Sequence, residues 1–257
     1  MSEVKHRRGK PRPAISTVDR AARVLSAFQS SWDFLTLNEL AERAGLSKPT
    51  VFRILASLGA EGLVFQNESN STYGLGFLTL RLADVIRSSS PSLERLREPM
   101  RAIRDQLNEN VGLALLDGDR TFDIEVLEGG NMITPAQIAG VAVPLHASVQ
   151  GKALLASMEP QEAGHYLSGL TGAGAPALQV GRLRRELNTI TAAGYASGCG
   201  DAMLGGHTIA MAMPSSPGGE SVALHVSFPQ ARFTEDLQAR CIAALEHVRG
   251  CLAQAGA

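Results

Sequence analysis

Apolar residues recur at helical spacing in the first part of the chain. From residue 16 to residue 28 they stand three or four positions apart, which predicts an amphipathic helix. A second helix is expected to begin after Thr36, because Thr36 and Glu39 have the T-x-x-E spacing of a capping box, and to end at Gly45. Two short helices therefore precede a third, which carries more informative polar residues.

The third helix is predicted in the stretch GLSKPTVFRILASL, residues 45–58. Ser47 is a natural N-cap, and Pro49 is tolerated in a first turn because its missing N–H is not needed there. The inward stripe consists of Val51, Ile54, Leu55 and Leu58. The next stretch, LVFQNESNSTYGL, alternates apolar and polar residues on both sides of a polar turn, which predicts a β-hairpin. Residues 15–76 are thus expected to form a winged helix-turn-helix.

Beyond the hairpin the pattern changes twice. Residues 77–90 keep an almost unbroken apolar helical pattern and are expected to form a linker helix. A second long helix follows, in which Pro99 predicts a kink or a frayed start. Two hairpin patterns, 112–129 and 207–228, then alternate with further helical segments. Residues 91–257 are therefore expected to form an α+β domain, with a central antiparallel sheet and helices outside it.

Composition narrows the class of protein. The 257 residues are 44% hydrophobic and 19% charged, which is typical of a globular protein, and this length favours two domains. The sequence has neither a signal-peptide pattern nor a run of about 18 apolar residues, so we expect a cytoplasmic protein with no membrane partner. The cysteines, Cys199, Cys241 and Cys251, lack C-x-x-C spacing, which argues against a disulfide framework or a zinc module.

Charge is unevenly distributed along the chain. Residues 1–90 hold 12 Lys and Arg against 8 Asp and Glu, a net charge of +4, whereas residues 91–257 hold 12 against 17, a net charge of −5. Part of the excess lies in residues 1–14, where Arg7 and Arg8 stand among prolines and a glycine, and this segment is expected to be a flexible basic arm. A solvated tail without a partner is the alternative.

These features together indicate double-stranded operator DNA as a partner. In a winged helix-turn-helix the second helix of the turn enters the major groove, and a basic arm can hold the flanking backbone or minor groove. The candidate DNA-binding residues lie in the arm or point away from the buried stripe, and they are Arg7, Arg8, Ser47, Lys48, Thr50, Phe52, Arg53 and Ser57. The alternatives are a three-helix domain that binds protein, or Phe52 packing on the first helix.

Catalytic and metal sites have weaker support. His146, Ser148 and Cys199 are of nucleophile or base types, but the sequence has no G-x-S-x-G, H-E-x-x-H or P-loop motif, so we do not expect an enzyme or a cofactor. Together, His207, His225 and Cys199 are an alternative metal site. Scattered histidines, however, are more often satisfied polar residues in a sheet than ligands.

Two stretches carry a family resemblance. LTLNELAERAGLSKPTVFRILASLGAEGLV with the YGLG that follows, and VPLHASVQGKALLA at residues 143–156, together resemble the IclR-type bacterial transcriptional regulators. The resemblance extends over about residues 15–250. It implies a winged-helix DNA-binding domain, a helical linker and a GAF/profilin-like effector domain. Such a domain senses a small organic molecule, usually a carboxylic acid, in homodimers that often pair into tetramers.

The resemblance also indicates an effector site. Thr208, His225 and Ser227 fall where the family has a Cys and two Ser ligand contacts. The first turn of the helix at residues 149–151 offers backbone N–H groups to an anion, whereas Lys152 opposes the helix dipole and is expected to lie on the surface or to pair with an acid. The candidate effector-binding residues are Met132, Ile133, Val149, Gln150, Gly151, Asp201, Thr208, His225 and Ser227.

Alternatives stay open for this site and for its domain. Thr208 and His225 can instead pair with each other across the hairpin. The whole domain from residue 91 onward can serve only to oligomerise the protein, or to bind a metal. A domain that only oligomerises would ignore every small acid, whereas a sensor would be stabilised by one of them.

Overall fold

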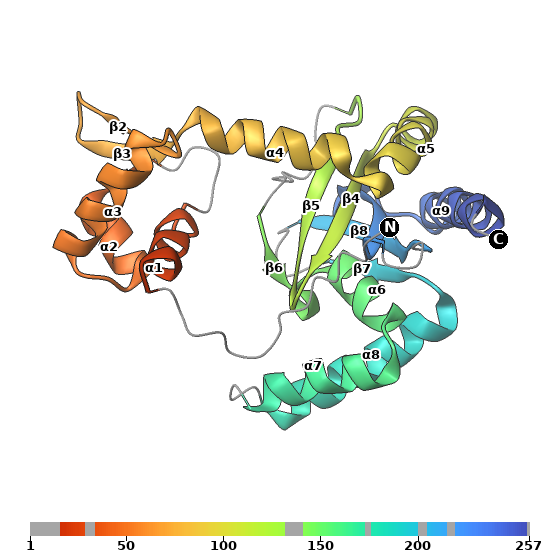
Figure 1. The fold of residues 1–257 in the computed structure, drawn as a ribbon. Coiled ribbons are helices and arrows are strands. Elements are labelled where there is room, and N and C mark those ends of the chain that lie inside the picture. The colour runs from red at the N-terminus through yellow and green to blue at the C-terminus, as the bar shows by residue number, and fades with distance from the viewer. Residues whose placement is uncertain are drawn as a thin grey trace. The chain divides into compact units, whose positions relative to one another are not determined.

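The computed structural model describes residues 16–28, 34–131, 141–172, 176–199, 205–214 and 219–255. These residues fall into two compact units, divided between Ser90 and Pro91. Figure 1 draws the helices and strands of both units, each of which is described separately below.

The N-terminal unit begins with three helices, α1 (Ser16–Leu25), α2 (Leu37–Ala44) and α3 (Lys48–Ala60). The predicted capping box of α2 is confirmed, because the Thr36 side chain accepts from the Glu39 N–H and the Glu39 carboxylate accepts from the Thr36 N–H. The predicted end at Gly45 is also confirmed, and its φ of 61° is the left-handed conformation that favours glycine. Local hydrogen bonding therefore sets the length of α2.

The same unit ends in a small antiparallel sheet and a helix. Its strands β1 (Leu35–Thr36), β2 (Val64–Asn67) and β3 (Thr72–Leu75) lie in the order β1-β3-β2, and α4 (Phe77–Ser89) follows them. The predicted hairpin of β2 and β3 is confirmed, whereas β1 was not expected because two residues are too short to show an alternating pattern. The winged helix-turn-helix is thus completed by a third short strand.

The C-terminal unit is a six-stranded antiparallel sheet with helices on both faces. Its strands lie in the order β6-β5-β4-β9-β8-β7. The elements are α5 (Pro91–Leu107), β4 (Asn110–Asp117), β5 (Arg120–Leu127), β6 (Val143–Pro144), η1 (Leu145–Ala147), α6 (Val149–Ser157), α7 (Pro160–Gly172), α8 (Ala177–Ala193), β7 (Ala196–Gly198), β8 (Gly206–Ala212), β9 (Val222–Pro229), η2 (Gln230–Arg232) and α9 (Glu235–Ala255). The α+β class and the GAF/profilin-like arrangement are therefore confirmed.

The two faces of this sheet carry different side chains. On one face α5 and α9 cover large apolar residues such as Leu113, Met211 and Phe228. On the other face α6 lies against β8 and β9, with α7 and α8 beyond it (Figure 1), and the strands contribute small residues such as Ala114 and Ala223. Successive side chains of a strand point to opposite faces of the sheet, so the large and small residues that alternate along one strand lie on different faces. The small residues leave room under α6 for polar side chains.

Helix α5 passes through Pro99 as one element, from Pro91 to Leu107. Its buried residues are Leu93, Leu96, Met100, Ile103 and Leu107. Of the three residues that follow, Asn108 has a left-handed φ of 57°, and Glu109 and Asn110 are buried polar groups. Glu109 pairs with Arg232 of η2, whose Nε lies 3.0 Å from Glu109 Oε1. This ion pair joins the end of α5 to the segment that leads into α9.

Removing the arginine of this pair should destabilise the protein markedly. The side chain of Glu109 is 4% exposed, so Arg232→Met leaves a buried carboxylate without its main cation. We expect the free energy of unfolding to fall by about 3 kcal/mol in urea titrations followed by circular dichroism. The control is Arg101→Met, because Arg101 pairs with Glu98 on the exposed surface of α5. A surface pair contributes less than about 1 kcal/mol to stability. Equal losses in the two variants would therefore contradict the prediction that the Glu109–Arg232 pair contributes more than a surface pair.

Candidate nucleic-acid interface and effector site

The exposed face of α3 carries the residues predicted to contact DNA. The predicted stripe of Val51, Ile54, Leu55 and Leu58 is buried against the rest of the unit. The opposite side exposes Ser47, Lys48, Phe52, Arg53 and Ser57, with Thr50 partly exposed. Phe52 is 55% exposed, so the alternative in which it packs against another helix does not describe this structure.

Three hydroxyl groups on this face have local partners. Ser47 occupies the N-cap position of α3 but makes no capping hydrogen bond, which corrects the expected role of its side chain. Its Oγ instead lies 2.8 Å from Oγ1 of Thr50, and one of the two hydroxyls donates a hydrogen bond to the other. Ser57 Oγ donates to the carbonyl oxygen of Arg53. The side chains of Lys48 and Arg53 supply the positive charge of this face.

The wing formed by β2 and β3 contains no cation from residue 63 to residue 76, and its turn is polar. At its tip the side chains of Asn67 and Asn70 accept hydrogen bonds from the residues two positions further along the turn. The only charge in the wing is Glu68. On the outer face of the sheet the rings of Phe34 and Phe65 meet edge to face at 5.9 Å.

Several predicted site residues lie outside the described residues. They are Arg7 and Arg8 of the arm, Met132 and Ile133 of the expected apolar wall, and Asp201 of the glycine-rich loop. The remaining effector candidates are all described.

Three of these candidates form one buried polar network beneath α6. Thr208 Oγ1 lies 2.9 Å from Ser227 Oγ, and Ser227 Oγ lies 3.4 Å from His225 Nδ1. On its other side His225 Nε2 lies 2.9 Å from Oδ1 of Asp123 on β5. Thr208, His225 and Ser227 are at most 3% exposed. A buried network of this kind is stable because each polar group has a hydrogen-bond partner.

The structure corrects the alternative in which Thr208 and His225 pair across the hairpin. Thr208 stands opposite Ser227 in the β8–β9 register, whereas His225 stands opposite Ala210. His225 therefore reaches across β4 toward Asp123, over the position of Gly112. A Cβ at Gly112 would lie 2.3 Å from His225 Nε2, so the imidazole needs a glycine beneath it.

The start of α6 is built as a buried helix N-terminus. Ser148 is the N-cap, and its Oγ accepts from the Gly151 N–H at 3.1 Å. Val149 and Gly151 are buried and Gln150 is partly exposed. The expectation that Lys152 pairs with an acid is confirmed, because its Nζ lies 2.8 Å from Glu186 of α8. Lys152 is therefore engaged with α8, and the Gly151 N–H is engaged with Ser148.

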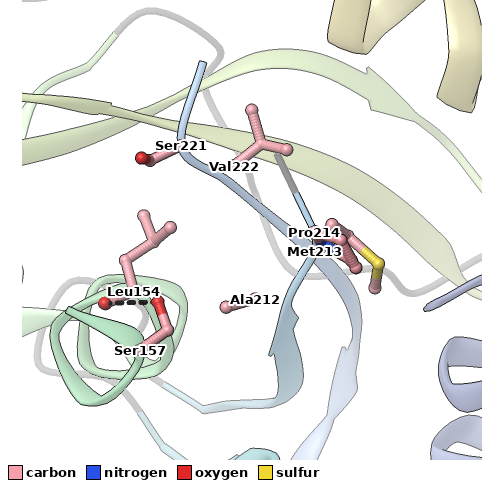
Figure 2. A pocket seen from close by; sticks show the side chains of 7 residues that line it. All are labelled: Leu154, Ser157, Ala212, Met213, Pro214, Ser221 and Val222. Carbon is pink, nitrogen blue, oxygen red and sulfur yellow. Dashed lines mark hydrogen bonds between the residues drawn. The ribbon is translucent and has the colours of Figure 1, made fainter. Parts of the chain in front are cut away.

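A cavity of about 360 Å³ lies toward the other end of α6. Figure 2 shows its lining side chains, with Leu154 and Ser157 on α6 facing the end of β8 and the start of β9. It is bounded by Ala212, Met213, Pro214, Ser221 and Val222 as well. This cavity is lined by a different set of residues from the Thr208–His225 network, which is packed closed.

The candidate metal ligands do not come together. His207 stacks on Phe228 and Phe233, on the α5–α9 face, whereas His225 lies on the α6 face. His207 Nδ1 and the Cys199 thiol both contact Oε1 of Gln230. Among the described residues no group of three or more His, Cys, Asp and Glu side chains is arranged to hold a metal ion.

The candidate nucleophiles and bases have structural partners. His146 Nδ1 lies 2.7 Å from the Tyr166 hydroxyl, and Ser148 caps α6. Burial raises the pKa of Tyr166, so its hydroxyl stays neutral and can donate to His146. Burial also raises the pKa of Cys241 to about 12, so this thiol is protonated and unreactive.

Three residues that shape the region beneath α6 are not predicted as part of it from the sequence. Asp123 and Gly112 belong to strands that lie far from His225 in the sequence, and only sheet register brings them together. An acid inside the alternating stretch TFDIEV is the one signal that was available for Asp123. Ser148 carries the N-cap signature of a Ser before an apolar helix, although its burial is a tertiary effect.

Comparison with known proteins places both units in one family. A family model described as the bacterial transcriptional regulator IclR C-terminal domain matches residues 80–251, and the IclR helix-turn-helix domain model matches residues 17–68. The chain belongs to the IclR family. Its expected resemblance to this family is thereby confirmed.

The curated relatives of this IclR-family chain have low sequence identity to it. It is 31% identical over 147 residues to the HTH-type transcriptional regulator Rv1719 of Mycobacterium tuberculosis, which covers 57% of this chain and 56% of the relative. Matches to two further curated regulators cover 62% and 61% of those proteins. The chain thus aligns with little more than half the length of these relatives.

Solved structures share the fold over nearly the whole chain. A regulator of the IclR type from Silicibacter is 25% identical, with a TM-score of 0.77 over 93% of this chain and 95% of its own. An IclR homologue from Microbacterium hydrocarbonoxydans, solved with 4-hydroxybenzoate, is 23% identical, with a TM-score of 0.69 over 93% of this chain and 99% of its own. The fold of the IclR family therefore accounts for both units.

None of the helices in the described ranges combines the length and the apolar character needed to cross a bilayer.

The glycine beneath His225 gives a direct test of the network geometry. Gly112→Ala places a methyl group on the imidazole, so it should break the contact with Asp123 and lower the free energy of unfolding by about 1–3 kcal/mol. The measurement is urea unfolding at pH 7. The matched control is Gly164→Ala in α7, where a Cβ meets nothing within 4 Å and alanine should stabilise the helix. A stability loss in the control, or none at Gly112, would refute this geometry.

Proposed function

We propose that this IclR-family protein is a ligand-responsive transcriptional regulator and not an enzyme. It binds double-stranded operator DNA through its N-terminal unit, and a small organic acid through its C-terminal unit, in the cytoplasm. The observation that carries the proposal is the exposed face of α3. This helix keeps its apolar stripe buried while Lys48, Phe52 and Arg53 remain available to DNA.

The DNA-binding role follows from the chemistry of this face. Lys48 and Arg53 suit phosphate oxygens and guanine edges, the hydroxyls of Ser47, Thr50 and Ser57 suit phosphates or bases, and the Phe52 ring suits a thymine methyl group. We assign Arg7 and Arg8 to the flanking backbone or the minor groove, because a basic arm in this fold is positioned to reach them.

The effector role is proposed for the region between the start of α6 and the network of Thr208, His225 and Ser227. Hydroxyls, an imidazole and the backbone N–H groups of Val149 and Gln150 are suitable donors for a carboxylate in a mostly apolar site, whereas the Gly151 N–H already donates to Ser148. Met132, Ile133 and Asp201 are assigned to the same site. The 4-hydroxybenzoate bound by the Microbacterium homologue supports a small acid, including an aromatic one, as the ligand class.

The proposal is tested on the DNA that flanks the gene of this protein. The full chain should shift a fragment of that DNA in a mobility assay, and one acid from a panel of neighbouring-pathway metabolites should change the apparent Kd. Arg53→Ala should raise the Kd on the operator by about 5- to 150-fold and relax discrimination at one base pair, as expected for loss of a bidentate guanine contact.

The control for this assay is Arg184→Ala, an exposed arginine on α8, which should bind the operator as the wild type does. If Arg53→Ala and Arg184→Ala bind DNA equally well, α3 is not the recognition helix. If operator binding is specific but no acid alters it, the C-terminal unit acts only in assembly.

Helix α4 supports a homodimer as the form that binds DNA. Five large apolar side chains are at least half exposed on its 13 residues, Phe77 at 85% being the most exposed, followed by Leu80, Val85, Ile86 and Leu82. Exposed apolar area of this kind is typical of a protein interface. Two recognition helices related by a two-fold axis would read a pseudo-palindromic operator, and pairs of dimers would form tetramers.

The double variant Leu80→Glu/Val85→Glu should dissociate the dimer, because it places four charges at a two-fold apolar contact. Sedimentation velocity should give a monomer for this variant and a dimer or tetramer for the wild type. Ala192→Glu on exposed α8 adds the same charge elsewhere and should leave the assembly intact. A wild-type protein that sediments as a monomer at every concentration would overturn the assignment.

A further inference from the structure

A pocket of about 350 Å³ lies on the N-terminal unit, where α1 packs against the end of α2 (Figure 1). Its lining, which we call the arginine pocket, consists of Ala22, Arg23, Ser26, Arg43, Ala44 and Gly45. Apart from Ala44, these residues are exposed. The arginine pocket is therefore open to solvent, and it offers two guanidinium groups and one hydroxyl to a group that enters it.

The guanidinium of Arg23 keeps most of its donors for such a group. Its Nη2 donates to the carbonyl oxygen of Gly45 at 3.4 Å, and it lies 2.9 Å from the place that a Cβ on Gly45 would take. Within the described part of the chain this is the hydrogen bond of the Arg23 side chain, and no carboxylate pairs with it. A guanidinium has five N–H donors, so four of them and the positive charge remain for another group.

Arg43 and Ser26 lie on either side of Arg23 in the lining. Arg43 Nη1 donates to the carbonyl oxygen of Ala27 at 3.1 Å, which holds this side chain across the junction of α2 and α1. Ser26 continues the last turn of α1, because its N–H bonds to the Ala22 carbonyl. Three positions separate it from Arg23, so the two side chains share one helix face. Two guanidinium groups and a hydroxyl are a donor set suited to phosphate oxygens.

The place of the arginine pocket along the chain indicates which phosphate it meets. Gly45 stands two residues before Ser47, the N-cap of α3, so their Cα atoms are at most about 8 Å apart. The start of α3 is the part proposed to enter a major groove, whose width is about 12 Å. Because α3 itself occupies the groove, a site beside its start meets the sugar-phosphate wall and not the base edges.

We propose that Arg23, with Arg43 and Ser26, binds one backbone phosphate in each operator half-site. The inference rests on the proposed operator binding and deepens it by adding a contact from α1 to those of α3. A phosphate contact carries no sequence information, but it fixes the register and angle at which the recognition helix enters the groove. Arg23 is thus a positioning residue for the base contact of Arg53.

Arg23→Gln removes the charge and keeps much of the side-chain length. The Kd of the full-length protein is measured on the operator and on random DNA, between about 50 and 200 mM salt. A dimer loses two phosphate contacts in this variant, so the slope of log Kd against log salt should fall by about 1.8, and both Kd values should rise about 10- to 100-fold. Their ratio should stay unchanged, whereas Arg53→Ala should change it.

Uncharged phosphates locate the contact on the DNA. Operators are synthesised in which one phosphate at a time is replaced by a methylphosphonate. With the wild type, one replacement in each half-site should raise the Kd about tenfold. The same replacement should have no effect on Arg23→Gln, which has already lost the contact. A purely structural role of Arg23 would leave the methylphosphonate effect equal in the two proteins.

A second pair of variants alters the arginine pocket and leaves Arg23 in place. Ala22→Glu adds a carboxylate at an exposed position of the lining, so it should raise the Kd and lower the salt slope as Arg23→Gln does. Ala22→Gln has nearly the same size without the charge and should bind DNA as the wild type does. Arg184→Gln removes an exposed arginine from α8 and should leave the salt slope unchanged.

The outcomes separate this inference from the proposed function. If the wild type binds no DNA, operator binding and the phosphate contact both fail. If the wild type binds the operator but neither Arg23→Gln nor Ala22→Glu lowers the salt slope, only the phosphate contact is overturned. The same holds if every methylphosphonate effect persists in Arg23→Gln. Should Arg23→Gln fail to fold, the comparison of Ala22→Glu with Ala22→Gln decides the inference.

Discussion

The C-terminal unit depends on one constraint, which is that polar groups buried under α6 must satisfy one another. Alternation along β8 and β9 sends the large apolar residues toward α5 and α9, so the opposite face keeps alanines, a glycine and the chain Thr208–Ser227–His225–Asp123. These side chains come from three strands, and none can move without leaving a partner unsatisfied. Strand register, the glycine at 112 and the closure of α6 are therefore coupled through a few hydrogen bonds.

The N-terminal unit depends more on local interactions than on a large core. Its helices are short and its core is small, so local devices such as the capping box of α2 and the left-handed Gly45 contribute much of its order. Large apolar side chains remain outside, on α3 and α4. Exposed apolar surface of this kind suits the DNA contact and the homodimer proposed above.

Sequence reasoning succeeded where the controlling interactions are local. The capping box at Thr36, the stripe from Val51 to Leu58 and the hairpin around Asn67 act over a few residues, so their signals are readable in order. Sequence reasoning failed where the controlling interactions join residues that are far apart in the chain. Asp123 and His225 are 102 residues apart, and neither carries a mark of the other. The hydroxyl of Ser47 has two partners within reach, the backbone at the start of α3 and the hydroxyl of Thr50. It bonds to Thr50, and the sequence spacing alone does not decide between the two.

The composition of the wing has a consequence for how such a protein would search DNA. Each cation placed on a phosphate releases counterions, and this release supplies most non-specific affinity. A wing whose only charge is Glu68 releases none, so the ionic attraction must come from cations elsewhere in residues 1–90, such as Lys48 and Arg53 on α3. In the proposed DNA complex, the hydroxyls and amides at the wing tip would add to binding only where the groove shape brings them within hydrogen-bond reach.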